Sequence, residues 1–167
     1  EAILYLKKAL GKNVFEPNLL KDLGRIYFLN GDYEEALNTL KGALSIAPAD
    51  AETLFFLGRT SMGLGNYEEA ALIFKKLIAD KTENRKQVLY FLGKTCGEQN
   101  NFGDAHYYLG IYYKEKRDKK NAIFHLQKAL DYIKEKGKKE KIRVMLKKIR
   151  GKKTKDKYTS DKKIFHG

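Results

Sequence analysis

The sequence predicts an all-α fold in which antiparallel helix pairs stack into an array closed by a C-terminal capping helix. Its 167 residues include only 2 prolines and no Trp, which favours helices joined by short turns. A Leu-Gly dipeptide recurs at spacings of 34, 35 and 17 residues, at Leu23-Gly24, Leu57-Gly58, Leu92-Gly93 and Leu109-Gly110. An alanine followed four residues later by Leu or Phe recurs at nearly the same spacings, at Ala2, Ala36, Ala70, Ala105 and Ala122. Two interleaved signatures predict two helices in each unit.

The first predicted element is a helix over residues 1–10. It carries only the second-helix signature, with Ala2, Leu6 and Ala9 on one face. We therefore expect the array to open on half a repeat, with the partner helix outside this chain. Such an opening is typical of a fragment of a longer protein.

Three full repeats are expected over residues 17–50, 51–84 and 86–119. Turn-forming residues separate the two helices of each repeat, at Asn30-Gly31-Asp32, Gly65-Asn66 and Asn100-Asn101. The glycine after each signature leucine has no side chain, so we expect the alanine of the second helix to face it in a close contact. Leu, Phe and Tyr at helical spacing around this contact predict the apolar stripe that neighbouring helices bury.

The last step of the repeat is shorter than the others. The 17-residue spacing predicts one helix, about residues 103–116, that ends one repeat and begins the next, which covers 103–135. The array then spans residues 1–133. A lysine-rich helix over 138–150, with Ile142, Met145, Leu146 and Ile149 on one face, is typical of a terminal cap. Residues 151–167 lack helical periodicity and are expected to form a mobile basic tail.

The signature positions resemble those of the tetratricopeptide repeat (TPR) family. The best match is residues 17–50, at Leu20, Leu23-Gly24, Tyr27, Gly31-Asp32-Tyr33, Ala36, Leu40, Ala43 and Pro48. The resemblance covers about residues 2–133. It implies a right-handed superhelix of helix pairs, in which the first helices line a concave groove for a peptide or a helix of another protein. It also implies a protein-protein interaction module, which we expect to be part of a larger bacterial protein.

Signatures of catalysis and of metal binding are missing from the sequence. Gly93-Lys94-Thr95 is similar to the end of a phosphate loop, but Val88 stands where that loop needs a glycine. His106, His125 and His166 have neither HExxH spacing nor a neighbouring set of carboxylates. The sequence therefore predicts a non-catalytic chain with no cofactor and no metal. It also has no apolar run long enough for a transmembrane segment.

Cations and aromatic side chains are expected to share the groove. Counted from the residue after each signature glycine, the groove face carries Lys21, Arg25, Phe28, Phe55, Arg59, Tyr90, Lys94 and Tyr107. Cations at one place in three consecutive repeats, flanked by aromatics, predict binding of an acidic or C-terminal carboxylate segment with apolar side chains. The alternative is a row of solvated charges that contributes little.

One branch of the family grips the carboxylate tails of chaperones with a set of Lys, Asn and Arg residues. Lys21 fits that set, whereas Arg25 stands in the place of Asn. Phe56, Gln87 and Phe91 occupy places that are polar or basic in those members. The complete carboxylate clamp is therefore absent.

Two other functions stay open. Residues 105–130 are similar to the repeat tails of bacterial membrane-associated zinc metalloproteases, which implies a substrate-docking role beside a catalytic domain outside this chain, and a periplasmic location. Residues 134–167 carry 15 basic and 4 acidic side chains, which is +11 of the net +13, and this end could bind nucleic acid or an anionic membrane surface. Few aromatics interleave with these charges, so no base-stacking platform is expected. The sequence does not decide the partner, the oligomeric state, or between bacterial cytoplasm and periplasm.

Overall fold

The computed structural model describes residues 2–11, 16–80 and 82–160, with the backbone alone for residues 2, 9, 10 and 152–160. Within these ranges all regular structure is helical. The helices are α1 (Ala2–Leu10), α2 (Pro17–Asn30), α3 (Tyr33–Ile46), α4 (Ala51–Gly63), α5 (Tyr67–Ala79), α6 (Arg85–Glu98), α7 (Phe102–Glu115), α8 (Lys119–Tyr132) and α9 (Lys136–Ser160). The predicted all-α fold is confirmed. None of these helices is long and apolar enough to cross a membrane.

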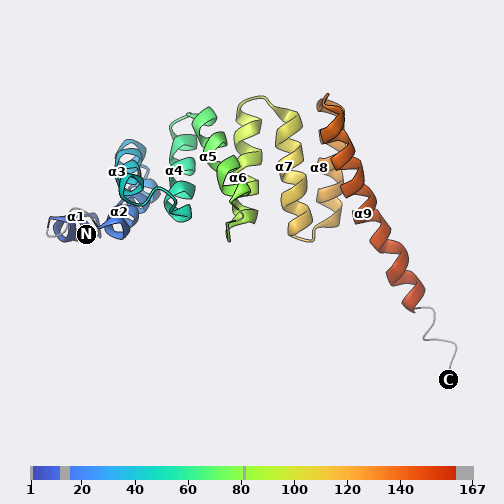
Figure 1. Ribbon diagram of the computed structural model, residues 1–167, viewed down its shortest axis with the longest axis horizontal. Coiled ribbons are helices and arrows are strands. Elements are labelled where there is room, and N and C mark those ends of the chain that lie inside the picture. The colour runs from blue at the N-terminus through green and yellow to red at the C-terminus, as the bar shows by residue number, and fades with distance from the viewer. Residues whose placement is uncertain (1, 12–15, 81, 161–167) are drawn as a thin grey trace, which may run out of the picture.

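The helices stack in chain order. Each helix packs against the next, and in addition α2 packs on α4 and α4 on α6. Figure 1 shows the resulting elongated array, with α1 at one end and α9 at the other. The first helices α2, α4 and α6 therefore form one continuous side of the array, which we call the first-helix face. Apolar residues form successive core clusters along the array, because each repeat contacts only its neighbours.

The close contact between paired helices differs in one detail from the sequence prediction. Ala36 is fully buried, but it does not lie opposite Gly24. A Cβ atom added at Gly24 would lie 2.6 Å from Cγ of Leu40, four residues after that alanine. The same holds for Gly58, where the nearest atoms belong to the ring of Phe74. Glycine is needed because the larger signature residue, not the alanine, fills the space above it.

Four turns between paired helices share one geometry. The first residue after α2, or the second after α4, α6 and α7, takes a positive φ, at Gly31 (89°), Gly65 (77°), Asn100 (56°) and Arg117 (64°). In the first of these turns the Gly31 amide donates to the Phe28 carbonyl and the next amide donates to the Tyr27 carbonyl, and the other three turns repeat this pair of bonds. Glycine adopts this conformation without cost, whereas an L-residue such as Arg117 is strained in it by about 1–2 kcal/mol.

Helix α7 plays both roles that the short step predicts. Leu109 lies against Gly93 of α6, as a second-helix residue should. On the other side Gly110 lies against Leu126 of α8, as a first-helix glycine should. One helix thus ends the third repeat and begins the last.

Helix α9 is longer than expected. Ile142, Leu146 and Ile149 are buried in one core cluster with residues of α8. The helix begins at Lys136 and continues to Ser160, beyond the predicted end at 150. Apolar periodicity reports packing rather than helix formation, and a lysine-rich sequence without proline can form a helix that has no apolar stripe. Residues 161–167 of the expected mobile tail lie outside the described residues.

Candidate functional site

Seven of the eight residues expected in the groove come from the three helices of the first-helix face. Lys21, Arg25 and Phe28 lie on α2, Phe55 and Arg59 on α4, and Tyr90 and Lys94 on α6. The eighth, Tyr107, lies on α7 and has a different neighbourhood. These residues fall into a central cluster around Arg59 and an ion-pair network around Lys21.

Arg59 is the centre of the first-helix face. Its guanidinium carbon lies 4.4 Å from the ring centroid of Phe28 on α2 and 4.7 Å from that of Phe91 on α6, so two neighbouring helices hold it between aromatic rings. Burial lowers the pKa of the Arg59 side chain, an effect that nearby Tyr33 partly opposes. Within the described part of the chain, no hydrogen bond or ion pair engages its N–H groups. The rings occupy its faces and leave its edge available to an acceptor.

Phe55 does not have the exposed position that the sequence predicted. It is only 7% exposed and contacts Phe74 and Phe91 in the core. Its neighbour Phe56 lies instead between α2 and α4, in ring contact with Phe28. Phe56 and Phe91 are half-buried and belong to the central cluster around Arg59, although the sequence did not predict them there. The signal in the sequence was that Phe56 directly follows Phe55 and Phe91 directly follows Tyr90. Adjacent residues of a helix point in directions about 100° apart, so one of two neighbouring aromatics can face the core while the other faces a neighbouring helix.

The aromatic rings form an unbroken series across four helices. The series runs through Phe28, Phe56, Phe55, Phe91, Tyr90 and Tyr112, and consecutive centroids are 5.3 to 5.8 Å apart. Tilted and edge contacts at such distances are favourable ring geometries. The series carries the apolar character of the first-helix face from α2 to α7.

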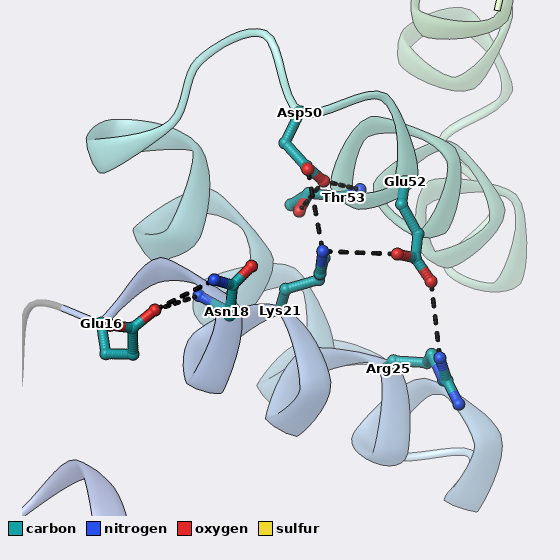
Figure 2. A network of polar contacts seen from close by, with 7 residues as sticks. All are labelled: Glu16, Asn18, Lys21, Arg25, Asp50, Glu52 and Thr53. Carbon is teal, nitrogen blue, oxygen red and sulfur yellow. Dashed lines mark hydrogen bonds and ion pairs between the residues drawn. The ribbon is translucent and has the colours of Figure 1, made fainter.

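Lys21 and Arg25 are engaged inside the chain rather than free. Figure 2 shows the Lys21 ammonium between Asp50 and Glu52, at 3.7 and 3.3 Å, with Arg25 donating to Glu52 at 3.4 Å. Burial disfavours the Asp50 carboxylate, but hydrogen bonds from Thr53 and the charge of Lys21 outweigh this and lower its pKa. Asp50 also caps α4 by accepting from the Thr53 amide at 2.7 Å. Two carboxylates at the start of α4, one from its N-cap residue and one from its first turn, therefore pair with the cations of α2.

The third repeat presents an unpaired cation beside aromatic rings. Lys94 is exposed, and its Nζ lies 5.9 Å from the Tyr90 ring centroid, with no ion pair to any described residue. The aromatic neighbour of Tyr90 on α7 is Tyr112, at 5.3 Å. Tyr107 is not part of this group, because the Nζ of Lys138 on α9 lies 4.7 Å from its ring. The short step turns Tyr107 toward the cap and Tyr112 toward the first-helix face.

The residues with possible catalytic or metal-binding chemistry have ordinary structural positions. Cys96 is a buried thiol, and burial raises its pKa to about 11. His106 and His125 face each other with Nδ1 atoms 2.9 Å apart, a pair that the sequence did not reveal. Burial lowers the pKa of both imidazoles. Among the described residues no group of three or more His, Cys, Asp or Glu side chains could hold a metal ion.

Stacked helix pairs, a glycine at each close contact and a shared turn geometry define a helical-repeat protein. Two family models, both described as tetratricopeptide repeat, match residues 27–95 and 1–51, and together they cover more than half of the chain. The chain belongs to the tetratricopeptide repeat family.

Known relatives agree with this assignment. The TPR repeat-containing protein MJ0263 of Methanocaldococcus jannaschii is 32% identical over 85 residues, which cover 44% of this chain and 27% of that protein. The match thus spans about a quarter of the relative. MamA AMB-1 superposes with a TM-score of 0.63 at 18% identity, covering 89% of this chain and 85% of that one. YrrB, described as a TPR protein with an unusual peptide-binding site, superposes with a TM-score of 0.56 at 18% identity, covering 81% and 78%. The solved structures show the same fold.

Proposed function

We propose that this chain is a non-catalytic protein-protein interaction module that binds an extended peptide or a helix of a partner across the first-helix face. The observation that carries the proposal is Arg59, a half-buried guanidinium held between Phe28 and Phe91 with no acceptor among the described residues. An acceptor on a partner, a carboxylate or a carbonyl group, would complete its hydrogen bonding. That YrrB, a protein of the same fold, has a peptide-binding site is in line with this function.

The aromatic series would supply most of the affinity. Micromolar binding needs about −8 kcal/mol, which exposed ion pairs of 0 to about 1 kcal/mol each cannot provide. Apolar side chains of the peptide would pack on the half-buried rings of Phe28, Phe56, Phe91, Tyr90 and Tyr112. Lys94 would add a charge contact at one end. Lys21 and Arg25 contribute less than the sequence suggested, because Asp50 and Glu52 already neutralise them.

Peptide selection followed by matched variants tests this proposal. A displayed library of random twelve-residue peptides is selected on the wild-type chain, and the affinity of the enriched peptides is measured by fluorescence anisotropy. We expect acidic and apolar residues in these peptides, a loss of about tenfold or more in Tyr90→Ala, and a smaller loss with a changed salt dependence in Arg59→Gln. Phe124→Ala is the matched control, because Phe124 is 51% exposed and lies on α8, away from this face. Equal losses in Tyr90→Ala and Phe124→Ala would contradict the assignment of the face.

The docking role implied by the resemblance of residues 105–130 to metalloprotease repeat tails stays a prediction. The complete open reading frame tests it directly. An upstream HExxH motif would support it, and a frame without that motif would exclude it.

A further inference from the structure

A cationic cavity lies at the other end of the array, where α9 separates from α8. Figure 1 shows α9 crossing α8 and then continuing away from the array. Between its second half and the α7–α8 turn there is a cavity of about 690 Å³. Its lining residues are Lys114, Glu115, Arg117, Lys119, Ala122, Lys148 and Ile149.

The lining of this cavity is strongly cationic. Lys114, Arg117, Lys119 and Lys148 are all exposed, and none forms an ion pair with any other described residue. Glu115, the one acidic residue among the described lining residues, is already paired with Arg85 at 3.0 Å. Four like charges around one recess repel each other, and an anionic ligand relieves that repulsion. Ile149, which is 8% exposed, adds a small apolar surface, whereas Ala122 is fully buried beneath it.

Arg117 lines the cavity although its backbone conformation is unfavourable for an L-residue. Its φ of 64° is the conformation that Gly31 and Gly65 supply in the corresponding turns of the first two repeats. Glycine there would remove the strain but also the guanidinium. An observed backbone outlier beside a charged recess is a reason to look for a ligand of opposite charge.

We propose that this cavity binds an acidic peptide segment of a partner protein, with its carboxylates among the four cations and an apolar side chain beside Ile149. No aromatic side chain is among the described residues that line the cavity, so these residues offer no platform to the unstacked bases of a nucleic acid. The cations surround a recess instead of forming a flat face, which suits a chain segment better than a bilayer surface. The site is separate from the first-helix face, so either proposal can fail alone.

Two turn variants with the same effect on stability distinguish this site from general charge attraction. The probe is the fluorescein-labelled peptide EELEELEE, with QQLQQLQQ as its neutral counterpart, in fluorescence anisotropy at physiological salt. Arg117→Gly should raise the melting temperature and weaken EELEELEE binding about tenfold. Asn100→Gly, at the equivalent place of the preceding turn, should also raise the melting temperature and leave the affinity unchanged.

A second matched pair uses adjacent lysines of α9. Lys148 lines the cavity, whereas Lys147 lies on another side of the helix beside Leu130. Lys148→Gln should weaken binding several-fold, and Lys147→Gln should change it less than twofold. Equal effects within either pair would show attraction to the net charge alone and overturn the proposal. The proposal would also be overturned if EELEELEE did not bind at all, while the wild-type chain bound a duplex oligonucleotide or phosphatidylserine vesicles and Arg117→Gly did not.

Discussion

The close contact at Gly24 gives the sharpest test of the packing. In Gly24→Ala the new Cβ would lie 2.6 Å from Cγ, 2.7 Å from Cδ2 and 3.3 Å from the amide nitrogen of Leu40. Leu40 is fully buried, so its branched carbon cannot move into solvent. Overpacking of this kind costs about 1–3 kcal/mol, and replacing a helical glycine by alanine returns about 0.5–1 kcal/mol. We therefore expect a net loss of up to about 2.5 kcal/mol, which lowers the melting temperature by up to roughly 10 °C in a chain of this size.

Gly42→Ala is the matched control for this substitution. Gly42 lies inside α3, and a Cβ added there would meet no atom within 4 Å. The same change should therefore stabilise the chain by about 0.5–1 kcal/mol. Urea unfolding followed by far-UV circular dichroism measures both variants. If Gly24→Ala were as stable as Gly42→Ala, the glycine signature would not reflect helix contact and the packing account would be wrong.

Three further results are expected. Burial lowers the pKa of His106 and His125 below the 6.5 of an unfolded chain, so the unfolded state binds more protons and the stability present above pH 6.5 should fall as the pH drops below it. Melting curves from pH 7.5 to 5.5 measure this fall. A double His→Gln variant whose melting temperature changed with pH by the same amount would contradict it. Deleting residues 152–167 should lower the helical signal slightly but leave the melting temperature nearly unchanged, because Ile149 is the last buried residue of α9 among those whose side chains the structure describes; a clear drop in melting temperature would show packing beyond that residue. Glu52→Gln should change the unfolding free energy by less than about 1 kcal/mol and strengthen binding of acidic peptides, because it releases Arg25 and leaves Lys21 paired with Asp50 alone; weaker binding in anisotropy would exclude these two cations from the site.

The repeat made most of the fold predictable. The spacing of leucine-glycine and alanine signatures located the helix pairs and the double role of α7, because each signature marks a close helix contact. The spacing did not show which residue fills the space above each glycine, because the signature alanine and the Leu or Phe four positions later lie on the same helix face. The extension of α9 was missed because residues 151–160 carry no apolar pattern at helical spacing, although their lysine-rich sequence without proline favours a helix.

The candidate site was predicted less well than the fold. Helical spacing placed Arg59, Phe28, Tyr90 and Lys94 on the first-helix face, but not the depth of each ring. Phe55 proved to be buried, and its neighbour Phe56 faces α2 instead. Burial depends on how three helices converge, and the sequence of one helix does not contain that geometry.

Chemical-shift mapping of a selected peptide on the ¹⁵N-labelled chain tests the central claim most directly. If the partner segment binds the first-helix face, amide shifts on titration should cluster in α2, α4 and α6 around Arg59, Phe91 and Lys94, and they should be absent from α3 and α5. Shifts concentrated in α3 and α5, or confined to α8 and α9, would contradict the claim that the aromatic series around Arg59 is the peptide-binding surface.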